Sequence, residues 1–128
     1  MAKYVLLGKY SSSYAEGMIH SPHDRMAIVK PLLKNMDAEL IEFLFIPSNP
    51  INDFVAIVET KDEKKLHAAI LTAYATGSFK NLNACRAYSN IEMTEIFQIG
   101  HDGMNSYITT KQKAGLEWCM EGLFHLHY

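Results

Sequence analysis

Residues 38–60, AELIEFLFIPSNPINDFVAIVET, consist of two apolar segments separated by a polar loop that contains two prolines. Aromatic and β-branched residues fill both segments, which is typical of strands. The prolines exclude a tight two-residue hairpin, and Pro47 ends the segment that precedes it. The stretch therefore predicts two strands, over 38–46 and 53–60, joined by a loop.

Both of these strands are apolar on both faces. Simple alternation places Leu40, Leu44 and Ile46 on one face of the first strand and Ile41, Phe43 and Phe45 on the other. It places Phe54, Ala56 and Val58 on one face of the second strand and Val55 and Ile57 on the other. A sheet with helices on one face and water on the other alternates apolar with polar residues. We therefore expect both faces of this sheet to be buried.

The second face needs a cover, because the two main helices of such a chain can cover only one face. We expect a second copy of the same sheet to cover it, which makes the protein a homodimer or a higher homo-oligomer. The alternative is that a C-terminal helix folds across this face and the protein stays monomeric.

The N-terminal part of the chain predicts one strand and one helix. Tyr4–Tyr10 is rich in β-forming residues and is followed by the breaker SSS. Ser21 and Pro22 indicate a helix start, with Ser21 as the N-cap and Pro22 at the first helical position. Apolar residues at helical spacing continue to Met36, and Pro31 is expected to kink this helix or shorten its regular part.

The middle of the chain predicts a second helix and a fourth strand. Thr60 and Glu63 form a capping box that opens the helix, and Gly77 suits its end. Residues 83–89 form the fourth strand.

The C-terminal part predicts further helices. Ser89 and Glu92 form another capping box and open a helix that is broken at Gly100–Gly103. From Tyr107 onward, apolar residues at roughly helical spacing predict an amphipathic C-terminal helix.

In order, the elements are β-α-β-β-α-β followed by helices, which is the order of a ferredoxin-like α+β sandwich with an antiparallel sheet. We expect residues 1–100 to form this domain. Residues 101–128 are expected to form a helical extension packed on the same domain or on the dimer.

Length and charge exclude several classes of protein. The 128 residues suit one domain, and the net charge of −2 gives no electrostatic reason to expect nucleic acid or an anionic membrane. No stretch suits a transmembrane helix, and the start MAKYVLLGKY is expected to be a strand and not a secretory signal. Cys85 and Cys119 lack metal-binding spacing, so we expect reduced thiols and a cytoplasmic protein.

Several stretches of the chain resemble the GYD domain family. They are KYVLLGKY (3–10), SPHDRM (21–26), AELIEFLFIP (38–47), FVAIVET (54–60) after an Asp, and CRAYSNIEMTEIF (85–97). The family belongs to the dimeric α+β barrel superfamily. The resemblance therefore implies a ferredoxin-like fold, a dimeric barrel and a cavity for a small ligand, but no particular reaction.

The family is named after a Gly-Tyr-Asp motif that leads into the third strand. Asp53 matches the Asp of that motif, whereas Asn52 stands at the tyrosine position and the glycine is absent. Arg25 and Arg86 resemble the arginines that the family carries in its first helix and last strand. Asp53 either caps the amides of its own loop or reaches a ligand.

Tyrosines and histidines supply the remaining candidates for a ligand site. Tyrosines from the strands and the second helix either line a pocket for a small aromatic compound or form an aromatic core with satisfied hydroxyls. The full set of candidate ligand-binding residues is Tyr10, His23, Arg25, Asp53, His67, Tyr74 and Arg86.

No metal or cofactor is expected. His20 with His23, and His125 with His127, lack the further converging ligands that a metal site needs. Resemblance to haem-binding members of the wider superfamily makes His67 a candidate axial ligand, against its simpler interpretation as a histidine on the flank of a helix.

Three functions remain open at this point. The first is a GYD-like protein that binds a small apolar or aromatic molecule in an internal cavity. The second is a cofactor-independent monooxygenase, isomerase or cyclase of the superfamily type, with Tyr10, His23 or His67 as the acid–base group. The third is a structural role in the assembly of an oligomer.

Overall fold

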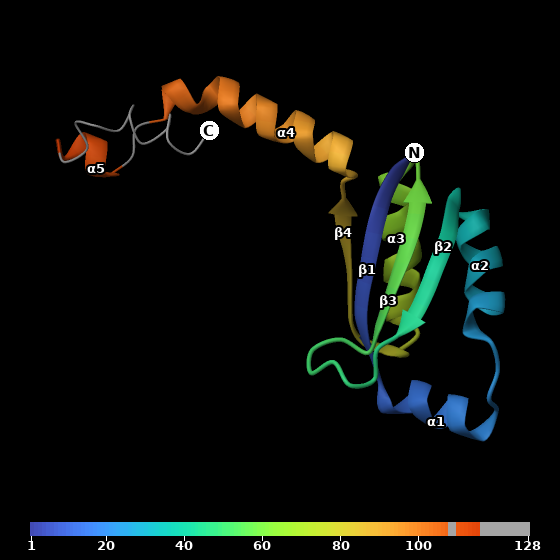
Figure 1. The fold of residues 1–128 in the computed structure, drawn as a ribbon. Helices are drawn as coiled ribbons and strands as arrows, with labels where there is room; N and C mark the ends of the chain where they lie inside the picture. The colour runs from blue at the N-terminus through green and yellow to red at the C-terminus, as the bar shows by residue number, and fades with distance from the viewer. Residues whose placement is uncertain (108–109, 116–128) are drawn as a thin grey trace. The chain divides into compact units, whose positions relative to one another are not determined.

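The computed structural model describes residues 1–107 and 110–115 (Figure 1). The elements are β1 (Ala2–Tyr10), α1 (Ser12–His20), α2 (Arg25–Asn35), β2 (Ala38–Phe45), β3 (Phe54–Thr60), α3 (Glu63–Ala75), β4 (Phe79–Ala87), α4 (Asn90–Gly103), the 3₁₀ turn η1 (Met104–Ser106) and α5 (Thr110–Lys113). The chain divides into two compact units, a sheet unit over 1–87 and a C-terminal unit over 88–128. The predicted division at residue 100 stays a prediction.

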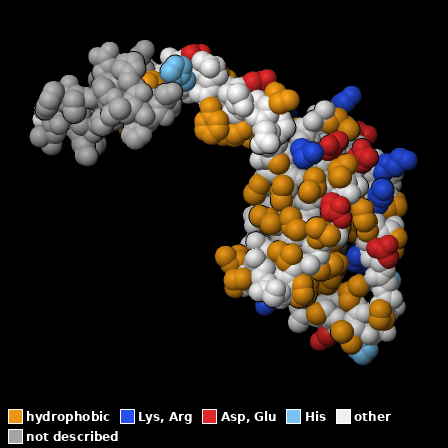
Figure 2. All heavy atoms as spheres, viewed as in Figure 1, with side chains coloured by type: hydrophobic (Ala, Val, Ile, Leu, Met, Phe, Trp, Pro, Cys, Tyr) orange, Lys and Arg blue, Asp and Glu red, His pale blue; other side chains and the backbone are white. Residues whose placement is uncertain are grey.

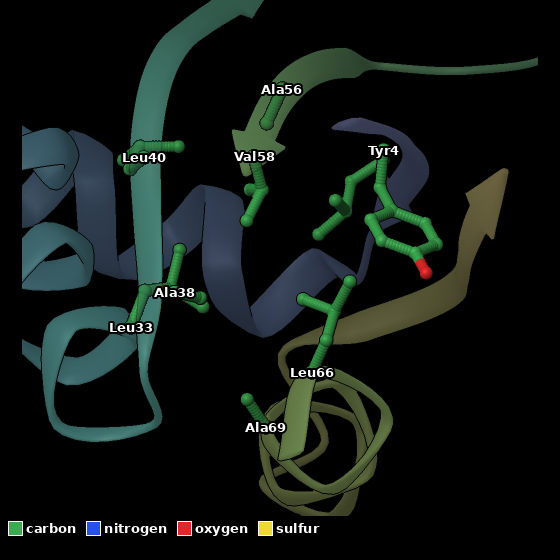
Figure 3. Close-up of a cluster of buried hydrophobic side chains, with 9 residues drawn as sticks. Tyr4, Leu33, Ala38, Leu40, Ala56, Val58, Leu66 and Ala69 are labelled. Atoms are coloured by element: carbon green, nitrogen blue, oxygen red, sulfur yellow. The ribbon is translucent and has the colours of Figure 1, made fainter. Parts of the chain in front are cut away.

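The sheet unit has the predicted ferredoxin-like α+β fold. Its four strands are in the order β2-β3-β1-β4, and every neighbouring pair is antiparallel. Helices α2 and α3 lie on one face of the sheet (Figure 1). The core lies between them and the sheet, and Figure 3 shows Ala56 and Val58 of β3 on the side of the sheet toward Leu66 and Ala69 of α3.

The predicted side-chain directions are correct for β3 and wrong for the second half of β2. In β3, Phe54, Ala56 and Val58 are buried against the helices. In β2, Leu40 pairs with Val58 but Glu42 pairs with Ile57, so Ile41 is an extra residue in the strand. A β-bulge of this kind switches the faces of all residues that follow it. Phe43 and Phe45 therefore share the helix-covered face with Leu40, and Leu44 lies on the opposite face.

The segment between β1 and β2 holds two helices and not one. The predicted breaker contains Ser11, which caps α1 by accepting a hydrogen bond from the Tyr14 amide. Ser21, predicted as an N-cap, instead follows the last residue of α1 as its C-cap. The N-cap of α2 is Asp24, whose Oδ1 accepts from the Met26 amide at 2.9 Å, and the helix continues through Pro31.

The capping box predicted at Thr60 is also wrong. Asp62 caps α3 through a hydrogen bond from the Lys65 amide to its Oδ1, at 3.2 Å. The buried Thr60 hydroxyl instead donates to the Asp37 carbonyl at 2.9 Å and accepts from the Asp62 amide at 3.0 Å. Thr60, the last residue of β3, thus joins the residue before β2 to the residue that caps α3.

Other predicted boundaries are confirmed or corrected. Gly77 follows the end of α3 with a φ of 78°, and Ser89 with Glu92 forms the predicted capping box of α4. The fourth strand begins at Phe79, four residues before its predicted start. The break predicted at Gly100 is absent, because α4 continues to residue 103.

Much of the predicted C-terminal helix from Tyr107 lies outside the described residues, as do Cys119, His125 and His127. Among the helices that the structure describes, none has both the length and the apolarity to cross a membrane.

Candidate functional site

Six aromatic side chains form a closed circuit at the end of the sheet where β1 and β2 end and β3 and β4 begin. In order around the circuit they are Tyr10, Tyr14, Phe79, Phe54, Phe43 and Phe45. Neighbouring ring centroids lie 5.1 to 6.4 Å apart, within the range of favourable aromatic contacts. All four strands and α1 are therefore joined by ring contacts at this end.

Asp53 fixes the end of β1 that carries Tyr10. Its Oδ2 accepts a hydrogen bond from the Tyr10 amide at 3.1 Å, and its own amide donates to a carbonyl of β1 at 2.7 Å. The amides of Ile51 and Asn52 in the adjoining loop donate to Asn49 Oδ1, at 2.9 and 2.8 Å. Asp53 thus holds β3 against β1, and Asn49 orders the loop.

A cavity of about 170 Å³ lies between the sheet and helices α2 and α3. Its sheet side includes Leu6, Phe54 and Ala56, and its helix side includes Val29, Ile70 and Ala73. Phe43 and Phe79 of the aromatic circuit also line it. On its sheet side, the small residue Ala56 lies between its larger cross-strand neighbours, Leu6 and Phe43. Few polar groups face this apolar space, as in typical small-molecule pockets.

Arg25 is the charged residue among those that line the cavity. Its Nη1 lies 3.2 Å from His23 Nε2, and His23 Nδ1 lies 2.8 Å from the Ser21 carbonyl oxygen. A guanidinium only donates hydrogen bonds, so Nε2 is the acceptor and Nδ1 carries the hydrogen that is donated to Ser21. This contact therefore requires a neutral His23, which orients Arg25.

Tyr14 of α1 lies against Arg25. The guanidinium carbon is 5.8 Å from the centre of the Tyr14 ring, within the range of a cation–π contact. Burial raises the pKa of the Tyr14 hydroxyl, and this effect outweighs the lowering by the nearby Arg25 charge. The Tyr14 hydroxyl therefore stays protonated at neutral pH and can act as a hydrogen-bond donor.

A second, more open groove of about 280 Å³ lies beside α1. Its walls are Tyr10, Tyr14, Ala15, Met18, Ile19 and Phe45. Three rings of the aromatic circuit face this groove and the other three face the cavity. The circuit therefore contributes rings to the lining of both spaces.

The family model described as the GYD domain matches residues 4–97. The chain belongs to the GYD domain family. The match includes nearly all of the sheet unit and with it every residue that lines the cavity. No curated protein and no solved structure matches the chain.

The structure of this GYD domain brings three of the predicted site residues together. Arg25 lines the cavity, His23 bonds to Arg25, and Tyr10 stacks on Tyr14 with ring centroids 5.1 Å apart. Tyr14 was not among the predicted residues, although Ser11 as N-cap and the four-residue spacing from Tyr14 to Met18 indicate a helix there.

Besides His23, four predicted site residues of the GYD domain line neither the cavity nor the groove. Asp53 bonds to the backbone of β1, as described above. His67 is exposed on α3 and lies 3.7 Å from Glu63, and the Tyr74 hydroxyl donates to the Lys80 carbonyl at 3.3 Å. The Arg86 guanidinium donates to the Lys3 and Ala87 carbonyls and lies over the Tyr4 ring. Their predicted role in ligand binding stays a prediction.

Proposed function

We propose that the sheet unit binds a small apolar or aromatic molecule in the cavity between the sheet and helices α2 and α3. The observation that carries this proposal is the apolar cavity of about 170 Å³, lined by aromatic and aliphatic side chains and by one charged group, Arg25. Small-molecule sites are typically apolar spaces of this kind with few polar groups that fix orientation.

The volume of the cavity limits the size of the ligand. An apolar protein cavity of about 150 Å³ binds benzene, whereas drug-sized ligands occupy pockets of about 300–1,000 Å³. At about 170 Å³, this cavity suits a molecule with a single ring. Haem belongs with the larger ligands. His67 is exposed on α3 and is not among the residues that line the cavity, so its ring could not bind an iron there.

Binding of toluene tests this proposal. A ligand at ten times its dissociation constant raises the free energy of unfolding by about 1.4 kcal/mol. For a unit of this size we expect the thermal midpoint to rise by roughly 5 °C or more. Methyl resonances of Leu6 and Val29, which line the cavity, should shift in the same titration. Naphthalene, with two rings, serves as the size control, and absence of any toluene effect would contradict the proposal.

We propose further that the protein forms a homodimer through the sheet face opposite α2 and α3, here called the open face. Val5, Leu7, Val55 and Ile57 of the open face are only half-buried, and Leu44 is 50% exposed. Figure 2 shows hydrophobic side chains gathered over the strands, with most of the charged side chains over the upper end of the sheet and on its right-hand side. An apolar face of this kind resembles one half of a core, as in obligate homodimers.

A charge in the open face tests the homodimer. We expect Leu7→Glu to convert the dimer into a monomer in light scattering at micromolar concentration, because the carboxylate would be desolvated opposite a second apolar sheet. Leu71→Glu is the matched control, since Leu71 is 68% exposed on α3 and outside the open face. A monomeric wild-type protein would refute the dimer and favour a cover from the C-terminal helix.

A further inference from the structure

Two hydrogen-bond donors, one on a residue that lines the cavity and one on a residue in contact with it, have no well-directed partner among the described residues. They are Tyr14 Oη and Arg25 Nε, both of which are buried atoms. Buried polar groups in proteins nearly always have a partner, and an unpaired one near a charge is costly. Because the two side chains are in contact, their unpartnered donors belong to one small region.

The other polar groups that line the cavity have less to offer a ligand. The Thr72 hydroxyl donates to the Ala68 carbonyl at 2.9 Å, and the Thr76 hydroxyl donates to the Ala73 carbonyl at 2.6 Å. These two donors are already used, and the Ser78 hydroxyl, which also lines the cavity, is hydrogen-bonded to Thr76 Oγ1 at 3.0 Å. The charge and the unpartnered donors are therefore both concentrated at Arg25 and Tyr14.

We propose that the ligand of the cavity is a small aromatic carboxylate, whose ring occupies the apolar space and whose carboxylate accepts from Tyr14 Oη–H and Arg25 Nε–H. This inference rests on the proposed function and names the chemical class of the ligand. It adds a defined anion-binding pair to an otherwise apolar site.

A carboxylate matches this pair better than other polar groups do. It has two oxygens and one negative charge, for two donors and one positive charge. A neutral amide or aldehyde offers one carbonyl oxygen and leaves the guanidinium charge without a counter-ion. A phosphate carries a charge of about −1.5 to −2 and three acceptor oxygens, which exceeds what one arginine and one tyrosine supply.

Three one-ring probes separate recognition of the ring from recognition of the charge. They are benzoate, benzamide and toluene, each titrated into the full chain by calorimetry at pH 7. We expect the wild-type protein to bind benzoate about tenfold or more tightly than benzamide, because hydrogen bonds to charged groups are the stronger ones. Equal affinities for benzoate and benzamide would overturn the inference.

Two substitutions identify the donors. We expect Arg25→Met to weaken benzoate binding about ten- to hundredfold and Tyr14→Phe to weaken it about three- to tenfold. Both variants should retain toluene binding, which also shows that they are folded. Arg86→Met and Tyr74→Phe are the matched controls, because neither residue is among those that line the cavity or the groove, and they should retain the preference for benzoate.

The outcomes also distinguish this inference from the function on which it rests. Toluene binding without a preference for benzoate would overturn the carboxylate inference and leave the cavity as a binding site. A benzoate preference that survives in Arg25→Met would overturn the assignment of the donors. Failure of all three probes to bind would overturn the proposed function and this inference together.

Discussion

Gly8→Ala is expected to lower the free energy of unfolding by about 2–3 kcal/mol, because the added carbon has no space. A Cβ at this position would lie 2.4 Å from Phe54 Cζ and 2.9 Å from the Asn81 carbonyl oxygen. The Phe54 ring cannot move aside freely, since it is packed between Phe43 and Phe79 in the aromatic circuit. Gly8 is thus the position at which the Phe54 ring crosses β1.

The same substitution at another glycine provides the control. Gly17 is inside α1, and a Cβ there would meet no atom within 4 Å. Gly17→Ala should therefore raise the free energy of unfolding by about 0.5–1 kcal/mol, as is usual for glycine in a helix interior. Chemical denaturation of both variants measures the two opposite changes.

A double variant tests the cause of the Gly8 effect. If the clash with the ring dominates, Gly8→Ala combined with Phe54→Leu should lose less stability than the sum of the two single variants. Strict additivity would show that the clash with the β4 backbone at Asn81 is the larger cost. A change of less than about 0.5 kcal/mol in Gly8→Ala alone would contradict the packing described for Phe54.

The fold could be predicted because strands, loops and several caps leave local signals in the sequence. The element order and the Ser89–Glu92 capping box needed only neighbouring residues. The bulge at Ile41 left only an indirect signal in Glu39 and Glu42, which fall on opposite faces of a regular strand but share one face when a residue is inserted between them. The apolar residues of β2 alone did not locate it, because under simple alternation they occupy both faces.

The site was less predictable because its residues come together only in the folded chain. Phe79 precedes the predicted fourth strand, and Tyr14 follows a serine run that resembles a loop. Arg25 was identified only by resemblance to the family. By contrast, His67 lies in a helix that was predicted, but its side chain faces Glu63 at the surface. Helical spacing alone did not determine the direction of this side chain.

Ala56→Ile is expected to abolish toluene binding, with an affinity loss of more than about a hundredfold, while it stabilises the protein. Ala56 is 2% exposed in β3 and lines the cavity between the larger side chains of Leu6 and Phe43. Isoleucine is favoured in strands, and its three additional carbons would occupy the space of the ligand. Burial at about 0.8 kcal/mol per carbon, less some strain, predicts a gain of about 1–2 kcal/mol.

The sign of the stability change distinguishes a true cavity from a well-packed core. Insertion of carbons into a filled core costs about 1–3 kcal/mol, so a destabilised Ala56→Ile that still binds toluene would contradict the cavity as the binding site. Ala87→Ile is the matched control, because Ala87 pairs with Lys3 on the open face and lines no part of the cavity. Ala87→Ile adds the same side chain to a strand and should leave the toluene affinity unchanged. Higher stability together with lost toluene binding is therefore expected only for the substitution inside the cavity.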